Sequence, residues 1–203
     1  MLVRTLQRFH HQPPQAISVP QSFLDNAQLV SDRLELLSRL PQCGRGMECG
    51  VDEGKFSRQI LDTCQPRELI LVDTWDSKRF SSSKMQRVQD DFTDEIAAGK
   101  IHIECSTSIE ALSRVADATL DWIYIDTDHS FGTTHGELVL ASKKVKRDGY
   151  ICGHDYTLGS WRGYIRYGVV EAVNAFCVEH HWQFAYLTHE SNRNLSFALK
   201  RCV

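Results

Sequence analysis

The sequence predicts an α/β domain with a seven-stranded, mostly parallel sheet, helices on both faces and an antiparallel hairpin at its C-terminal end. Five short apolar runs alternate with helix-like segments, which is typical of a parallel sheet covered on both sides. Two further apolar runs have no helix between them, so we expect them to pair antiparallel. The predicted strands are 47–49, 69–72, 101–103, 122–125, 150–153, 183–188 and 195–200.

The chain before the first strand divides into an arm at 1–20 and the start of a single domain at 21–203. The arm is polar and rich in proline. Residues 21–40 carry apolar side chains at helical spacing, which predicts a helix over this segment. The apolar positions are Phe23, Ala27, Val30, Leu34 and Leu37.

The helices between the strands follow from apolar spacing and from their end signals. Ser108 is a plausible cap for one of them. We expect a turn at Asp148-Gly149 and a loop over 159–168. The predicted helices are 55–63, 80–98, 108–115, 133–146 and 169–180.

The charge balance and the cysteines restrict the class of protein. The net charge is −3 at pH 7, so the chain has no basic footprint for nucleic acid or for a membrane surface. No apolar run approaches the ~20 residues of a membrane helix, and the first residues do not form a signal peptide. The seven cysteines include no Cys-x-x-Cys pair. We therefore expect a cytoplasmic protein with reduced, mostly buried thiols.

A glycine-containing turn follows the first predicted strand of the sheet, from Glu48 to Gly54. Gly50 and Gly54 allow the backbone to turn tightly and to approach a ligand, and the helix that follows offers free N–H groups. Such a turn also occurs without any ligand. Asp52 stands where a dinucleotide fingerprint needs its middle glycine, so the turn does not predict an NAD site.

Polar residues also follow the next two predicted strands. Asp73 ends one strand roughly twenty residues after Gly50, a distance at which an acid can bind two ribose hydroxyls. Thr74 and Trp75 come next, and the indole ring could stack on a purine or belong to the core. Ser106 and Thr107 could bond an adenine edge, although serine and threonine also cap helices.

A third group of polar residues follows the strands 122–125 and 150–153: Asp126, Asp128, His129, His154 and Asp155. Strands of this kind are usually adjacent, so Asp126 and Asp155 should face one another. Two close carboxylates repel unless a proton or cation lies between them. Their hard oxygen ligands suit Mg²⁺, which makes them candidate metal ligands.

Four segments together resemble the class I S-adenosylmethionine-dependent methyltransferases, most closely the group called methyltransferase family 24. They are MECGVDEGKFSRQIL, ELILVDTW, LDWIYIDTDHSF and RDGYICGHDY, and the likeness covers roughly residues 45–200. The resemblance implies a Rossmann-like fold and S-adenosylmethionine (SAM) as the cofactor.

The resemblance also implies roles for individual residues. Glu48 and Gly50 would lie by the methionine part of SAM, Asp73 would hold the ribose, and Ser106-Thr107 would face the adenine. Gly54, Thr74, Trp75 and Asp126 complete the expected cofactor contacts. Catechol- and macrocin-type O-methyltransferases place metal-binding acids where Asp126 and Asp155 stand. Asp52 departs from the family's usual glycine, so its side chain has to point away from the cofactor.

Methyl transfer needs aligned reactants and a group that removes a proton from the acceptor. His129 is the first candidate for that base and His154 the second, because imidazole titrates near neutral pH. Each could instead be a structural histidine. Asp126 completes the predicted catalytic set. Tyr156 and the aromatic, cationic loop 161–167 could cover the acceptor.

The function predicted is transfer of a methyl group to an oxygen of a small molecule, with Mg²⁺ as a candidate cofactor. We expect neither nucleic acid nor membrane as partner, and a homodimer is possible. A non-catalytic cofactor-binding domain is one alternative, supported by Asp52. A phosphohydrolase is another, because Ile125-Asp126-Thr127-Asp128 resembles an Asp-x-Asp nucleophile loop.

Overall fold

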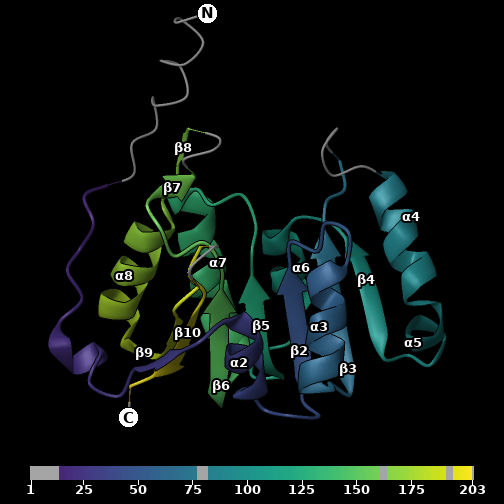
Figure 1. Ribbon diagram of the computed structural model, residues 1–203, viewed down its shortest axis with the longest axis horizontal. Helices are drawn as coiled ribbons and strands as arrows, with labels where there is room; N and C mark the ends of the chain where they lie inside the picture. The colour runs from purple at the N-terminus through teal and green to yellow at the C-terminus, as the bar shows by residue number, and fades with distance from the viewer. Residues whose placement is uncertain (1–13, 77–81, 161–163, 191–193, 203) are drawn as a thin grey trace, which may run out of the picture.

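The computed structural model describes residues 14–76, 82–160, 164–190 and 194–202 (Figure 1). Its main sheet has eight strands: β1 (Gln28–Val30), β2 (Arg45–Cys49), β3 (Glu68–Asp73), β4 (Ile101–Cys105), β5 (Leu120–Ile125), β6 (Val145–Gly153), β9 (Trp182–Thr188) and β10 (Phe197–Arg201). Their order is β1-β9-β10-β6-β5-β2-β3-β4. A two-stranded ribbon, β7 (Gly159–Ser160) with β8 (Ile165–Arg166), lies within the segment expected to be a loop.

The strand pairing confirms the predicted sheet and extends it by one strand. The strands from β2 to β6 pair in parallel. The last two strands form the expected antiparallel hairpin, and β10 also pairs antiparallel with β6. The carboxyl ends of β2, β3, β4, β5 and β6 therefore share one edge of the sheet, which is where such sheets bind ligands.

The helix predicted over 21–40 is wrong. This segment forms the short 3₁₀ helix η2 (Gln21–Phe23), the strand β1 and the helix α2 (Arg33–Ser38). β1 pairs in parallel with the outer edge of β9 and becomes the eighth strand. Asp32 caps α2 by accepting hydrogen bonds from the N–H groups of Leu34 and Glu35, both at 2.9 Å. Open backbone groups of β9 and this strong cap outweigh the helical spacing of the apolar residues.

The other helices follow the prediction with local corrections. Two helices replace the one expected over 80–98. α6 is capped by Thr107 rather than Ser108, and β6 runs through the expected turn at Asp148-Gly149. The helices are α3 (Lys55–Cys64), α4 (Ser82–Asp91), α5 (Thr93–Ala97), α6 (Ser108–Arg114), α7 (Phe131–Lys144) and α8 (Val169–His180).

The sheet separates two hydrophobic cores (Figure 1). Apolar side chains of α6, α7 and α8 pack on one face, around Met47, Ile123 and Phe176. Those of α2, α3 and α4 pack on the other face, around Leu71 and Trp122. The layers confirm the predicted helices on both faces of the sheet.

Several further predictions concern the chain as a whole. All seven cysteines are free, and four of them are buried, in agreement with the expectation of reduced, mostly buried thiols. Within the described ranges, no helix is both long and apolar enough for a membrane span. Ile17 of the predicted arm accepts a hydrogen bond from Asn174 on α8 at 2.9 Å. The division into an arm and a domain stays a prediction.

Candidate active site

The turn after β2 has a left-handed backbone at three positions: φ is +92° at Gly50, +52° at Asp52 and +75° at Gly54. A Cβ atom on Gly50 would lie 1.8 Å from the carbonyl oxygen of Asp126, so only glycine fits there. The amide of Asp126 also donates to the carbonyl of Cys49 at 2.8 Å. The turn after β2 and the loop after β5 are therefore in direct backbone contact.

Asp73, at the end of β3, holds this turn in place. Its Oδ2 accepts hydrogen bonds from the N–H groups of Val51 and Asp52, both at 2.9 Å, and its Oδ1 accepts one from Trp75 N–H at 3.1 Å. An ionised carboxylate can accept about four hydrogen bonds, so Asp73 keeps acceptor capacity for a ribose hydroxyl. The predicted ribose contact thus fits the structure and stays a prediction.

Trp75 is 4% exposed and packs in the core on the α3 side of the sheet. Its Nε1 donates to the carbonyl of Asp52 at 3.0 Å. Thr74 donates instead to Asp76, at 2.8 Å. The indole stabilises the turn through this hydrogen bond and through its packing in the core. The structure therefore favours the alternative of a core tryptophan over stacking on a purine.

Asp52, the residue that departs from the family's glycine, directs its carboxylate toward α4. It forms an ion pair with Lys84 of α4, whose Nζ also lies 3.5 Å from Glu53 Oε1. This pairing matches the requirement that the side chain point away from the cofactor. It therefore weakens the sequence-based support for the alternative of a non-catalytic cofactor-binding domain.

Glu48 is 1% exposed, and its Oε2 accepts a hydrogen bond from Ser57 Oγ at 2.5 Å. Burial raises the pKa of Glu48 to about 8, although the bond from Ser57 acts against this. The carboxyl group is therefore buried between β2 and α3. Its predicted place beside the methionine part of SAM stays a prediction.

Ser106 and Thr107 follow β4 as expected. Thr107 forms a capping box with Glu110, which accepts from the Thr107 N–H at 3.1 Å and from its Oγ1 at 2.9 Å. Ser106 Oγ lies 3.5 Å from a guanidinium nitrogen of Arg114. Both residues stand at the ligand edge of the sheet, and capping accounts for the Thr107 hydroxyl without a cofactor.

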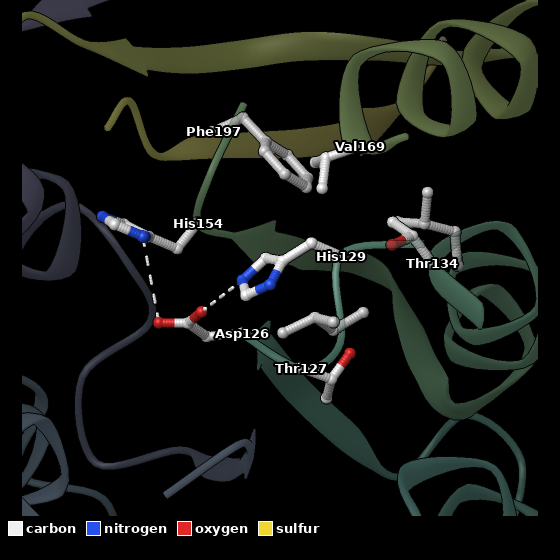
Figure 2. Close-up of a pocket in the computed structure, with 9 residues that line it drawn as sticks. Asp126, Thr127, His129, Thr134, His154, Val169 and Phe197 are labelled. Atoms are coloured by element: carbon white, nitrogen blue, oxygen red, sulfur yellow. Dashed lines mark hydrogen bonds and ion pairs between the residues drawn. The ribbon is translucent and has the colours of Figure 1, made fainter. Parts of the chain in front are cut away.

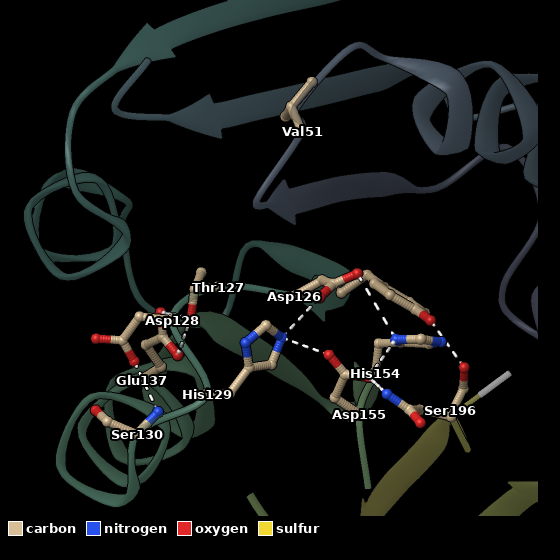
Figure 3. A network of polar contacts seen from close by, with 12 residues as sticks. Val51, Asp126, Thr127, Asp128, His129, Ser130, Glu137, His154, Asp155 and Ser196 are labelled. Atoms are coloured by element: carbon tan, nitrogen blue, oxygen red, sulfur yellow. Dashed lines mark hydrogen bonds and ion pairs between the residues drawn. The ribbon is translucent and has the colours of Figure 1, made fainter. Parts of the chain in front are cut away.

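Four of the five predicted acids and histidines after β5 and β6 come together (Figures 2 and 3). His129 Nε2 lies 3.2 Å from Asp126 Oδ1 and 2.6 Å from Asp155 Oδ2. His154 Nδ1 lies 3.2 Å from Asp155 Oδ1 and 3.8 Å from Asp126 Oδ2. The two carboxylates thus share histidine partners, and we call these four residues the Asp-His cluster.

His129 supplies the positive group that two neighbouring carboxylates need. Burial acts to lower its pKa, but the hydrogen bonds to Asp126 and Asp155 raise it to about 9. For Asp155, burial acts to raise the pKa, and the bonds from His129 and His154 hold it well below its usual range. His129 also stacks on Tyr167, with ring centroids 4.6 Å apart. In this arrangement His129 is a cation at neutral pH, which is the wrong form for a base.

His154 differs from His129 in its free ring nitrogen. With Nδ1 next to Asp155, its Nε2 is buried and has no hydrogen-bond partner within the described part of the chain. A proton on Nδ1, bonded to the carboxylate, leaves Nε2 as an acceptor. Asn194 donates a hydrogen bond to Asp155 from the loop before β10. No sequence signal marked Asn194, because it stands in a polar turn.

Asp128 does not join the cluster. Its carboxylate accepts from the N–H of Ser130 at 2.8 Å and from Thr133 Oγ1 at 2.9 Å, so it supports the turn before α7, whose N-cap is Ser130. This role leaves the Asp-x-Asp motif without its second acid at the site. The structure thus argues against the phosphohydrolase alternative.

A second polar group, missed in the sequence, supports the loop after β5. Glu137 of α7 is fully buried and accepts hydrogen bonds from Ser108 and from Thr127, the latter at 2.9 Å (Figure 3). Burial raises its pKa to about 7, against the effect of both hydroxyls. Its place one turn from Thr134 on the buried stripe of α7 was the available signal.

A small cavity of about 10 Å³ adjoins the cluster, which is room for about one water molecule. Its lining residues come from β5, the loops after β5 and β6, α7, α8 and β10: Ile125, Asp126, Thr127, His129, Thr134, Leu138, His154, Val169 and Phe197 (Figure 2). Tyr156 packs on Phe184 and Phe197, and its hydroxyl donates to Asn174 at 2.7 Å. Residues 161–163 of the expected cover lie outside the described residues.

The fold and this site define a class I SAM-dependent methyltransferase. A family model described as a methyltransferase domain matches residues 47–156, more than half of the chain. The match includes the turn after β2, Asp73 and the whole Asp-His cluster. The chain therefore belongs to this family, and SAM is its cofactor.

Solved structures agree on the fold. A SAM-dependent methyltransferase from Aquifex aeolicus has 10% identity and a TM-score of 0.61, with 89% of this chain and 93% of that chain covered. SMU.1697c, a candidate methyltransferase from Streptococcus mutans in complex with SAH, has 10% identity and a TM-score of 0.61. The match covers 84% of this chain and 96% of that chain. The pyocyanin biosynthetic protein PhzM has 9% identity and a TM-score of 0.59, and the match covers 79% of this chain and about half (51%) of PhzM. No functionally curated protein matches the sequence.

Proposed function

We propose that this methyltransferase transfers the methyl group of SAM to an oxygen of a small molecule, with His154 as the base. The observation that carries the proposal is the contact between the turn after β2 and the Asp-His cluster, made through Gly50 and Asp126. A cofactor on that turn would have its reactive end beside titratable groups.

The two parts of the site have separate tasks. SAM supplies a methyl group already activated by its sulfonium, and Asp73 and the Gly50 turn would hold it. The protein then has to orient the acceptor hydroxyl and take its proton. Asp155 fixes the orientation of His154 through Nδ1, so that Nε2, which has no partner among the described residues, can accept that proton. His129 holds Asp126 and Asp155 together and takes no proton from the acceptor.

A small acceptor agrees with the charge of the chain. The net charge of −3 offers no footprint for a polyanion. Apolar side chains of Val169, Phe197 and Leu138 lie beside the cluster, around a cavity with room for about one water molecule.

The test is formation of SAH from SAM in the presence of a panel of small phenols and hydroxy acids, with total tRNA as a competing acceptor. We expect turnover with a hydroxylated small molecule, and a loss of at least about a hundredfold in kcat for His154→Ala, the usual size of a base's contribution. His102→Ala, on exposed β4, is the matched control and should keep full activity. Methylation of tRNA alone, or full kcat in His154→Ala, would overturn the proposal.

Assistance by Mg²⁺ is a separate question. Asp126, His154 and Asp155 have ligand atoms within 4.8 Å of one another. However, His129 Nε2 lies between the two carboxylates, and one of the three ligands is an imidazole, whereas Mg²⁺ prefers oxygen. The residues as placed do not fit Mg²⁺, and we expect EDTA to leave kcat unchanged. Loss of turnover in EDTA, restored by Mg²⁺, would show that an ion replaces His129.

A further inference from the structure

A second cluster of potential metal ligands lies on the outer surface, where α7 and α8 pack side by side (Figure 1). It consists of His135 on α7 and of Glu179 and His180 at the end of α8. Each offers one ligand atom, and these atoms lie within 4.8 Å of one another. The proposed methyl transfer uses none of the three residues, and the cluster shares no residue with the Asp-His cluster.

The spacing of two of these atoms already suits a metal ion. His135 Nε2 lies 3.1 Å from Glu179 Oε2. Around a tetrahedral zinc ion with bonds of ~2.0–2.2 Å, two ligand atoms are about 3.3 Å apart. The ring of His180 has its centroid 6.3 Å from that of His135. The ligand atoms of all three residues already lie within 4.8 Å of one another, so coordination needs only a small approach of His180.

Aromatic neighbours hold both imidazoles before any ion binds. Phe131, one turn earlier on α7, stacks on His135 with centroids 5.5 Å apart and an interplanar angle of 17°. Phe176, one turn earlier on α8 and fully buried, packs against His180 with centroids 5.1 Å apart. Restricting the rings in this way lowers the entropy lost when an ion is bound.

We propose that His135, Glu179 and His180 form a binding site for a divalent transition-metal ion of the zinc type. Two imidazoles and one carboxylate are ligands that Zn²⁺ prefers, with a fourth position open to water. The same ligands suit Mg²⁺ and Ca²⁺ poorly, because those ions take oxygen. The carboxylate and the open surface favour entry of a cation.

A bound ion would link two helices that carry parts of the active site. α7 begins directly after the loop with His129, and α8 begins after Tyr167, whose ring stacks on His129. An ion that binds only the folded arrangement stabilises it by mass action. The domain should therefore unfold at a higher temperature in the presence of Zn²⁺.

The test is calorimetric titration of tag-free protein with ZnCl₂, together with thermal unfolding with and without Zn²⁺. We expect binding and a higher Tm in the wild type, a loss of at least about tenfold in affinity in His135→Ala and in His180→Ala, and no comparable binding of MgCl₂. His102→Ala, which removes another exposed histidine on β4, should bind Zn²⁺ like the wild type.

Asp155→Asn separates this site from the Asp-His cluster. If the ion binds at α7 and α8, this variant keeps its affinity for Zn²⁺. Equal affinity in His135→Ala, His180→Ala and the wild type would overturn the proposal, as would the absence of binding at 100-fold excess metal. None of these outcomes depends on methyl transfer, so they are independent of the proposed function.

Discussion

Four residues other than glycine have a left-handed backbone at the strand ends that build the site: Asp52, Trp75, His129 and Asp155, with φ between 44° and 64°. Such a conformation costs about 1–2 kcal/mol for a residue with a Cβ atom. Hydrogen bonds from the turn to Asp73 and ion pairs within the Asp-His cluster hold these residues in place. Strain of this kind concentrates where side chains have to be aimed at a ligand.

At Gly50 the constraint is steric as well as conformational. We expect Gly50→Ala to lower the free energy of unfolding by more than about 2 kcal/mol and to abolish SAM binding, because its Cβ would collide with the Asp126 carbonyl. Gly136→Ala is the matched control. It lies inside α7, where a Cβ meets only Ile109 at 3.6 Å, so it should gain about 0.5–1 kcal/mol.

Urea unfolding of both variants and calorimetry with SAM check this prediction. Wild-type stability in Gly50→Ala would mean that the turn after β2 does not contact the loop after β5.

The sequence predicts that the acids and histidines after two successive strands meet, and Asp126, His129, His154 and Asp155 do so, whereas Asp128 does not. The sequence does not distinguish the two imidazoles as candidate bases. Only the structure shows that one lies between two carboxylates while the other keeps a free nitrogen, because that depends on backbone angles with no sequence signature.

At the scale of elements, α6 and α7 meet the loop after β5 through one buried acid. Glu137 accepts hydrogen bonds from Ser108 at the start of α6 and from Thr127 in the loop. An ionised carboxylate at this depth is costly, and the two hydroxyls offset only part of that cost. The junction is therefore most stable when Glu137 is protonated.

Glu137→Gln should become more stable than the wild type as the pH rises. The folded pKa of about 7 lies above the ordinary value of 4.5, so the wild type loses stability from about pH 4.5 up to about pH 7, while the amide keeps its hydrogen bonds. We expect an advantage on the order of 1–3 kcal/mol at pH 8 and almost none below pH 4.5.

Urea unfolding across this pH range measures the difference. Glu110 provides a control of opposite sign, because hydrogen bonds from Thr107 lower its pKa. Glu110→Gln should be less stable than the wild type at neutral pH and should approach it in acid. The quantity to compare is the stability of Glu137→Gln minus that of the wild type. A smaller difference at pH 8 than at pH 4 would contradict the prediction.

The segment 21–40 shows why some elements could not be predicted. Its apolar residues fit a helical stripe, yet β1 forms because β9 offers an unpaired edge that arises only from the complete sheet. Where local pattern and tertiary contact agree, as in α8, the predicted bounds are those observed. Where long-range pairing decides, as in β1, local spacing misleads.

For the molecule as a whole, the alternation of strands and helices was sufficient to predict a two-sided sheet and its closing hairpin. The order of the strands was not read from local patterns. It follows from the connections and from the packing of the two cores, each of which collects side chains from distant parts of the chain. A test of the whole fold therefore needs a probe in each core.

The free cysteines provide those probes. Cys49 and Cys177 lie in the core beneath α6, α7 and α8, and Cys64 and Cys152 lie in the core beneath α2 and α3. Burial raises the pKa of Cys64 and of Cys177 to about 12, and those of Cys49 and Cys152 well above the ordinary value. All four thiols are therefore unreactive as well as inaccessible.

The remaining three cysteines are exposed: Cys43, Cys105 and Cys202. A pulse of iodoacetamide at pH 7.5 should label these three at least about a hundredfold faster than the four buried ones, because reaction of a buried thiol has to wait for opening that costs several kcal/mol. Peptide mass spectrometry resolves each site, and labelling in urea should equalise all seven. Rapid native labelling of Cys49 and Cys177 alone would contradict the packing of α6, α7 and α8 on the sheet. Rapid labelling of Cys64 and Cys152 alone would contradict the packing of α2 and α3.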